Sequence, residues 1–101
     1  MDATTIQSIL SHVPDYESFL TVDELRASSH RLAGQFPDAV EILSLGHSRQ
    51  GDPIEALKIG SGAKTAMLFA MPHPNEPIGG MMLEFLSQRL AEDDELHQSL
   101  G

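Results

Sequence analysis

The stretch Phe69–Gly80, FAMPHPNEPIGG, places a histidine and a glutamate, His73 and Glu76, three residues apart between prolines. Pro72 and Pro77 flank the pair, and Pro74 lies between its two members. Each proline ring fixes φ at about −65°, so the backbone around both side chains is restricted. A continuous apolar run, TAMLFAM (65–71), leads into the stretch, and a helical pattern follows it. The sequence therefore predicts a stiff loop that joins a strand to a helix.

The elements on either side of this loop have different periodicities. The run 65–71 is short and apolar throughout, which is typical of a strand buried on both faces. The pattern over 79–93 predicts a helix, with Asn75 as its N-cap and Pro77 in its first turn. Its apolar face is predicted to contain Met82, Leu83, Leu86 and Leu90. Together with Met67, Met71 and Met81, Met82 is expected to fill gaps in the core.

The first part of the chain has helical patterns over 4–13 and 21–36. Thr21 and Glu24 have the spacing of a capping box, in which each side chain binds the other residue's backbone N–H. Pro37 then ends the second pattern. We expect residues 1–37 to form an N-terminal helical segment.

The next part has the composition of a β-hairpin. The segments AVEILSL (39–45) and PIEALKI (53–59) are rich in β-branched and aliphatic residues, and the polar loop 46–52 separates them. With the later strand and helix, this order predicts an α/β fold with a mixed sheet and flanking helices. We expect residues 38–101 to supply the hairpin, central strand and helix of a single domain. We expect this domain to be truncated, because a buried central strand needs neighbours on both sides.

Composition limits the classes of function. A chain of 101 residues is one small domain at most, with a thin core. Its net charge of −9 argues against nucleic-acid or membrane partners. Without cysteine, a metal would be held by histidine, aspartate or glutamate. No signal peptide or long apolar span is recognisable, so a cytoplasmic location is expected.

His73 and Glu76 are candidate zinc ligands. His73 directly follows the predicted strand and Glu76 precedes the predicted helix, at the sheet edge where α/β proteins bind ligands. Zinc accepts imidazole nitrogen and carboxylate oxygen, and flanking prolines reduce the entropy lost on binding. A second interpretation stays open, in which Glu76 is only a favourable charge at a helix N-terminus.

The hairpin and the loop together resemble the M14 zinc carboxypeptidase family. Five residues match the family's hairpin pattern G-x-S-x-x-G-x-P-I: Gly46, Ser48, Gly51, Pro53 and Ile54. His73 and Glu76 match its H-x-x-E zinc pair. The resemblance covers roughly residues 39–91.

The resemblance implies one zinc ion held by His73, Glu76 and a second histidine, in an enzyme that cleaves an amide bond next to a free carboxylate. The substrate would be a peptide. In the family a separate glutamate is the general base and arginines bind the substrate carboxylate. These residues and the third ligand lie further along the family sequence than residue 101. We therefore expect no catalytic residue within this chain and no activity from the chain alone.

Asn75 departs from the family pattern, because the family has arginine at this position. The resemblance leaves Asn75 as a substrate-binding residue that hydrogen-bonds through its amide. Asparagine before the glutamate is a feature of a related zinc-dependent family of N-acyl-amino-acid deacylases, whose substrates are acylated amino acids. The third hypothesis is a non-catalytic interaction module, which pairs its exposed strand edge with a partner or with a second copy of itself.

The remaining histidines are expected to be exposed to solvent rather than to bind the metal: His12, His30, His47 and His97.

Overall fold

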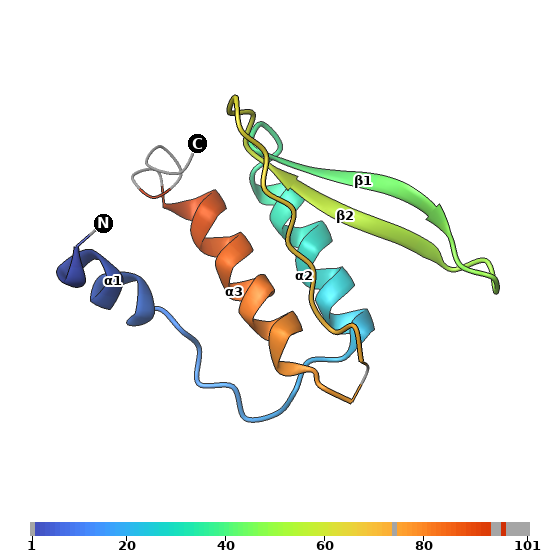
Figure 1. Ribbon diagram of the computed structural model, residues 1–101, viewed down its shortest axis with the longest axis horizontal. Helices are drawn as coiled ribbons and strands as arrows, with labels where there is room; N and C mark the ends of the chain where they lie inside the picture. The colour runs from blue at the N-terminus through green and yellow to red at the C-terminus, as the bar shows by residue number, and fades with distance from the viewer. Residues whose placement is uncertain (1, 74, 94–95, 97–101) are drawn as a thin grey trace.

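A computed structural model describes residues 2–73, 75–93 and 96 of the protein (Figure 1). In the described residues the chain forms helices α1 (Ala3–Leu10) and α2 (Val22–Gln35), then strands β1 (Val40–His47) and β2 (Pro53–Ile59), and finally helix α3 (Ile78–Glu92). The predicted α/β class, with helices flanking a sheet, is confirmed. Whether the chain divides at residue 37 stays a prediction.

Helix α2 begins with the predicted capping box. The Glu24 backbone N–H donates to Thr21 Oγ1 at 3.1 Å, and the Thr21 N–H donates to Glu24 Oε1 at 3.1 Å. Two N–H groups that the helix itself leaves unpaired are thereby satisfied. The helix ends at Gln35, two residues before Pro37, as the sequence predicts.

The hairpin is antiparallel and runs in register from Val40 opposite Ile59 to His47 opposite Pro53. A bulge between Ser44 and Gly46 interrupts it. Gly46 has a φ of 134°, a conformation that side chains with a Cβ rarely adopt. The bulge therefore explains the first glycine of the hairpin pattern.

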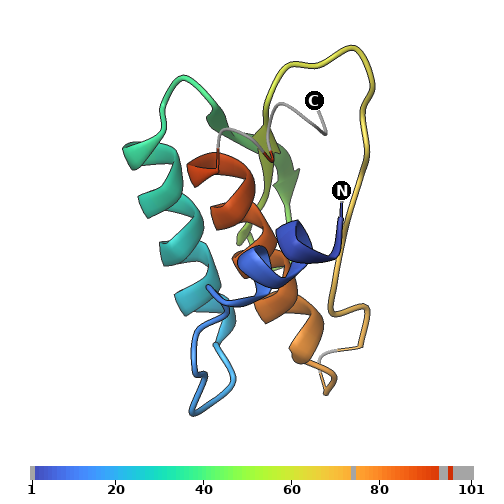
Figure 2. The same cartoon turned by 90° about the vertical axis from the view of Figure 1, so that its left-hand side faces the viewer.

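Helices α2 and α3 lie side by side, and the hairpin packs against them near its open end (Figures 1 and 2). The core contains Leu32, Val40 and Ala91, which are 4%, 3% and 8% exposed. Partly buried residues surround them: Ala33, Phe36, Ala39, Leu57 and Ile59. No described side chain is less than 2% exposed, so the core is as thin as the chain length predicts.

The prediction of a buried strand over 65–71 is wrong. Among the described residues this segment pairs with no strand, and Met67 and Phe69 are 83% and 76% exposed. In Figure 2 its first part, residues 65–69, runs on the side away from α2, and only Ala70 and Met71 approach the start of α3. A strand that is apolar on both faces is stable only when neighbours supply hydrogen bonds and cover, and the described residues supply neither.

Two smaller predictions about the helices also need correction. Helix α1 ends at Leu10 rather than at residue 13. In α3 the residue that packs inward is Met81, at 8% exposed, whereas Met82 is 60% exposed. Met67 and Met82 are therefore surface residues and do not fill the core. No helix in the described ranges is long and apolar enough to cross a membrane.

Candidate metal centre

His73 and Glu76 lie in one tight turn that immediately precedes helix α3. The Glu76 backbone N–H donates to the His73 carbonyl oxygen at 3.0 Å, which closes the four-residue turn. Pro77 follows as the residue that caps the helix, with a φ of −81°. Two of the three flanking prolines, Pro72 and Pro77, are described, while Pro74 lies outside the described residues. The turn brings the two candidate ligands onto one short segment, as their spacing predicts.

The side chains of this turn are open to solvent. His73, Asn75 and Glu76 are all exposed. Within the described part of the chain, none of the three side chains makes a hydrogen bond or ion pair, although Pro74 lies between them and is not described. An imidazole and a carboxylate are therefore present without protein partners that a metal would have to displace.

The chemistry of this pair fits part of a zinc site. Zinc in a catalytic site is held by three protein ligands, of which histidine and glutamate are two common types. The described residues contain no group of three or more histidine, aspartate or glutamate side chains that could hold a metal. The pair supplies two donors, and a third donor is not beside it in the described ranges.

Asn75 is not the N-cap of α3, contrary to the prediction. The helix begins at Ile78 with Pro77 at the cap position, and no side chain satisfies its first N–H groups. The Gly80 N–H instead donates to the Pro77 carbonyl oxygen at 3.1 Å. The Asn75 amide therefore remains available to bind a ligand.

Two glycines at the start of α3 form a seat for the chain that leads into the turn; we call Gly79 and Gly80 the glycine seat. A Cβ added at Gly79 would lie 3.0 Å from the Ala70 Cβ, and one at Gly80 would lie 2.7 Å from the Met71 sulfur. This role of the two glycines was not predicted from the sequence. The signal was available, because consecutive glycines disfavour a helix and so indicate a close approach of another segment.

The other histidines lie elsewhere. His12, His30 and His47 are exposed, as predicted, and His97 lies outside the described residues. His30 Nε2 contacts Glu55 Oε1 at 3.0 Å, which links α2 to β2. His12 Nδ1 lies 2.9 Å from the Ser8 carbonyl oxygen. These contacts have local structural roles.

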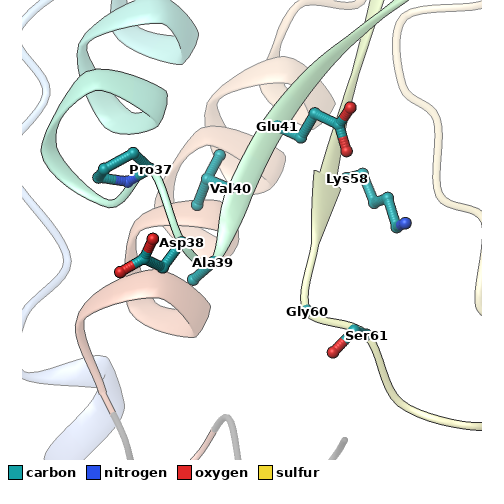
Figure 3. A pocket seen from close by; sticks show the side chains of 8 residues that line it. All are labelled: Pro37, Asp38, Ala39, Val40, Glu41, Lys58, Gly60 and Ser61. Atoms are coloured by element: carbon teal, nitrogen blue, oxygen red, sulfur yellow. The ribbon is translucent and has the colours of Figure 1, made fainter.

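Two hollows on the surface lie away from the turn. Figure 3 shows the hollow where β1 begins and β2 ends, and its lining includes Asp38, Glu41 and Lys58. A second hollow lies between α2 and the start of β2. Neither is lined by His73 or Glu76. The candidate centre is an exposed turn, outside these two hollows.

The hairpin and the turn fall within one known sequence family. The family described as zinc carboxypeptidase (Peptidase_M14) matches residues 25–100, which are 76 of the 101 residues of the chain. The match includes most of α2, the hairpin, the turn and α3. No curated protein matches the chain.

Proposed function

The chain belongs to the zinc carboxypeptidase family, and we propose that His73 and Glu76 are two ligands of the zinc ion in a hydrolase of this type. The substrate would carry an amide bond next to a free carboxylate. One observation carries the proposal: both side chains are exposed on a single turn closed by a 3.0 Å hydrogen bond, and neither has a partner in the described part of the chain.

Each residue of the turn has a distinct task in this proposal. His73 contributes a neutral ring nitrogen and Glu76 a carboxylate oxygen, which are donors that zinc prefers. When bound, zinc supplies Lewis acidity toward the carbonyl group of the scissile bond. The Asn75 amide would hydrogen-bond the substrate. The third ligand and the general base come from residues other than those described, so we expect the chain alone to be inactive.

Zinc affinity tests the proposal directly. A competition titration against a chromophoric chelator would compare the wild-type chain with His73→Ala and Glu76→Gln. We expect each substitution to weaken zinc binding by about tenfold or more, because each removes one of only two donors. The matched control is His47→Ala, which removes an exposed histidine at the end of β1. Equal affinity in all four proteins would contradict the proposal.

Hydrolysis assays test the expected inactivity and the choice of substrate. The chain would be incubated with peptides and with N-acylated amino acids, with and without a chelator. Chelator-sensitive cleavage that is lost in Glu76→Gln would contradict the expected inactivity. Cleavage of acylated amino acids alone would favour the alternative of an N-acyl-amino-acid deacylase, in which Asn75 precedes the glutamate as it does here.

A specific observation favours a second candidate function, that of an interaction module. Met67, Leu68 and Phe69 are 83%, 62% and 76% exposed in an extended segment without a strand partner among the described residues. An exposed apolar segment of this kind can pair, as a strand, with a strand of another chain. Under this proposal the segment pairs with a second copy of the chain.

A further inference from the structure

We propose that the glycine seat, Gly79 and Gly80, positions the zinc-binding turn. The inference rests on the proposed function, since it assigns these residues the task of fixing where His73 and Glu76 stand. The two glycines touch neither ligand. They act by admitting the backbone of Ala70 and Met71 against the first turn of α3.

The Gly79 contact involves atoms that cannot move without moving the backbone. The three nearest atoms to a Cβ at this position are Ala70 Cβ at 3.0 Å, Ala70 Cα at 3.8 Å and the Met71 nitrogen at 3.9 Å. The alanine side chain is a single methyl group, which cannot relieve the clash by adopting another rotamer. Any side chain at position 79 would therefore push the segment at residue 70 outward by a few tenths of an ångström.

The Gly80 contact holds the next residue. Gly80 is buried, and a Cβ there would meet the Met71 sulfur at 2.7 Å and Leu25 Cδ1 of helix α2 at 3.0 Å. Met71 itself has a φ of 63°, in the left-handed region that residues with a Cβ disfavour. Such a conformation persists only when the surrounding structure stabilises it. Here the packing of the Met71 side chain against Gly80 stabilises it.

These contacts close the chain around the turn. A Cβ added at Gly79 would lie 3.0 Å from the Ala70 Cβ, so residues 70 and 79, on either side of the turn, lie close together. One end is fixed by the seat, and the other continues into the helix through the hydrogen bond from Gly80 N–H to the Pro77 carbonyl oxygen. A loop held at both ends loses less entropy when its side chains converge on a metal.

The experiment adds a methyl group on one side of the contact and removes one from the other side. Gly79→Ala adds a Cβ at the seat, and Ala70→Gly in the same chain removes the Cβ that it meets. Gly34→Ala is the matched control, because Gly34 also lies in a helix but has no atom within 4 Å of an added Cβ. Two readouts are taken from the full chain: zinc affinity by chelator competition, and backbone amide chemical shifts of residues 71, 73, 75 and 76.

We expect Gly79→Ala to weaken zinc binding by about tenfold, in line with other residues that orient metal ligands without touching the metal. Its amide shifts should change at His73 and Glu76, while the melting temperature stays close to that of Gly34→Ala. Adding Ala70→Gly should restore both affinity and shifts. A general loss of stability would lower the melting temperature and would not be rescued in this way.

The positioning role would be overturned if Gly79→Ala left the amide shifts of His73 and Glu76 unchanged. It would also be overturned if Ala70→Gly did not reverse the changes. The shifts require no zinc, so this result is separate from a failure of the proposed function. That failure would instead appear as wild-type zinc binding no tighter than in His73→Ala.

Discussion

Two polar residues remote from the turn, Tyr16 and Glu84, have buried atoms without partners among the described residues: the Tyr16 hydroxyl and Glu84 Oε2. Burial raises the pKa of the Glu84 carboxyl above its ordinary value of 4.5, although the charge of Arg31 and a hydrogen bond from Gln88 oppose the shift. Burial also raises the pKa of the Tyr16 hydroxyl, and the Glu84 charge adds to this effect. The ionised form of Glu84 is therefore less favourable in the folded state than in the unfolded state.

Glu84→Gln is expected to stabilise the fold at neutral pH. Because the folded-state pKa is raised, the favourable contribution of Glu84 is complete below its unfolded pKa and is lost as pH rises through the folded value. The variant should therefore have a higher unfolding free energy than the wild type at pH 7. Below the unfolded pKa the gain should vanish.

Urea denaturation at pH 4 and pH 7 measures this difference. Glu17→Gln, at an exposed glutamate, is the control and should change little at either pH. A Glu84→Gln variant that is less stable than wild type at pH 7 would show that the attraction of Arg31 outweighs the cost of burial.

Single residues were predictable from sequence where their role is local. The spacing of His73 and Glu76, with prolines around them, indicated that both would share one loop, and they share one turn. The roles of Gly79 and Gly80 were not predicted, because they depend on which segment crosses the helix. Asn75 was expected to cap α3, but Pro77 takes that position, and a proline without a side-chain acceptor is a weak sequence signal for a cap.

At the scale of elements, α2 owes its start to a pattern contained within four residues. Thr21 and Glu24 bind each other's backbone N–H at 3.1 Å. Both also accept these bonds at the positive end of the helix dipole. This helix packs against α3 and β1, so its start also fixes the face that carries Leu32.

Thr21→Ala is expected to lower the unfolding free energy by about 1 kcal/mol, the usual cost of removing an N-cap hydroxyl. Glu24→Gln is the conservative counterpart, since a glutamine side chain still accepts from the Thr21 N–H. Thermal denaturation followed by circular dichroism compares the two. A loss in Glu24→Gln with none in Thr21→Ala would mean that charge at the helix start, rather than capping by the Thr21 hydroxyl, is responsible.

The failed strand prediction over 65–71 has a physical reason at this same scale. A capping box needs only its own residues, whereas a strand needs hydrogen bonds from chains that are distant in sequence. The apolar composition of the segment was judged correctly, but its pairing depends on neighbours that are not among the described residues. The hairpin over Val40–His47 and Pro53–Ile59 formed as predicted because each strand is the partner of the other.

The whole molecule exposes more surface than its mass implies. A compact monomer of 11.0 kDa would expose about 5,600 Å² by the usual scaling. The structure exposes 7736 Å², and its exposed large apolar residues include Phe69, Ile78 and Met82. Exposed apolar surface of this extent is typical of an interaction site.

Self-association is the measurable consequence of the second candidate function. We expect the wild-type chain to form dimers or larger species at high concentration, more strongly in added salt, which screens its net charge of −9. Phe69→Lys should return it to monomer, whereas Leu10→Lys, at a leucine 58% exposed on α1, should not. Analytical ultracentrifugation distinguishes these outcomes. A wild-type chain that stays monomeric at every concentration and salt would contradict the pairing.

The ring nitrogens of the histidines report directly on whether His73 binds zinc. Long-range ¹H–¹⁵N NMR spectra of the full chain would be recorded as zinc is added, with Glu76→Gln as the companion variant. If His73 and Glu76 bind zinc, the signal of a His73 ring nitrogen should shift as zinc is added, and those of His12, His30 and His47 should stay unchanged. Glu76→Gln should require more zinc for the same shift. Zinc-induced shifts at the other histidines with none at His73 would contradict zinc binding by His73.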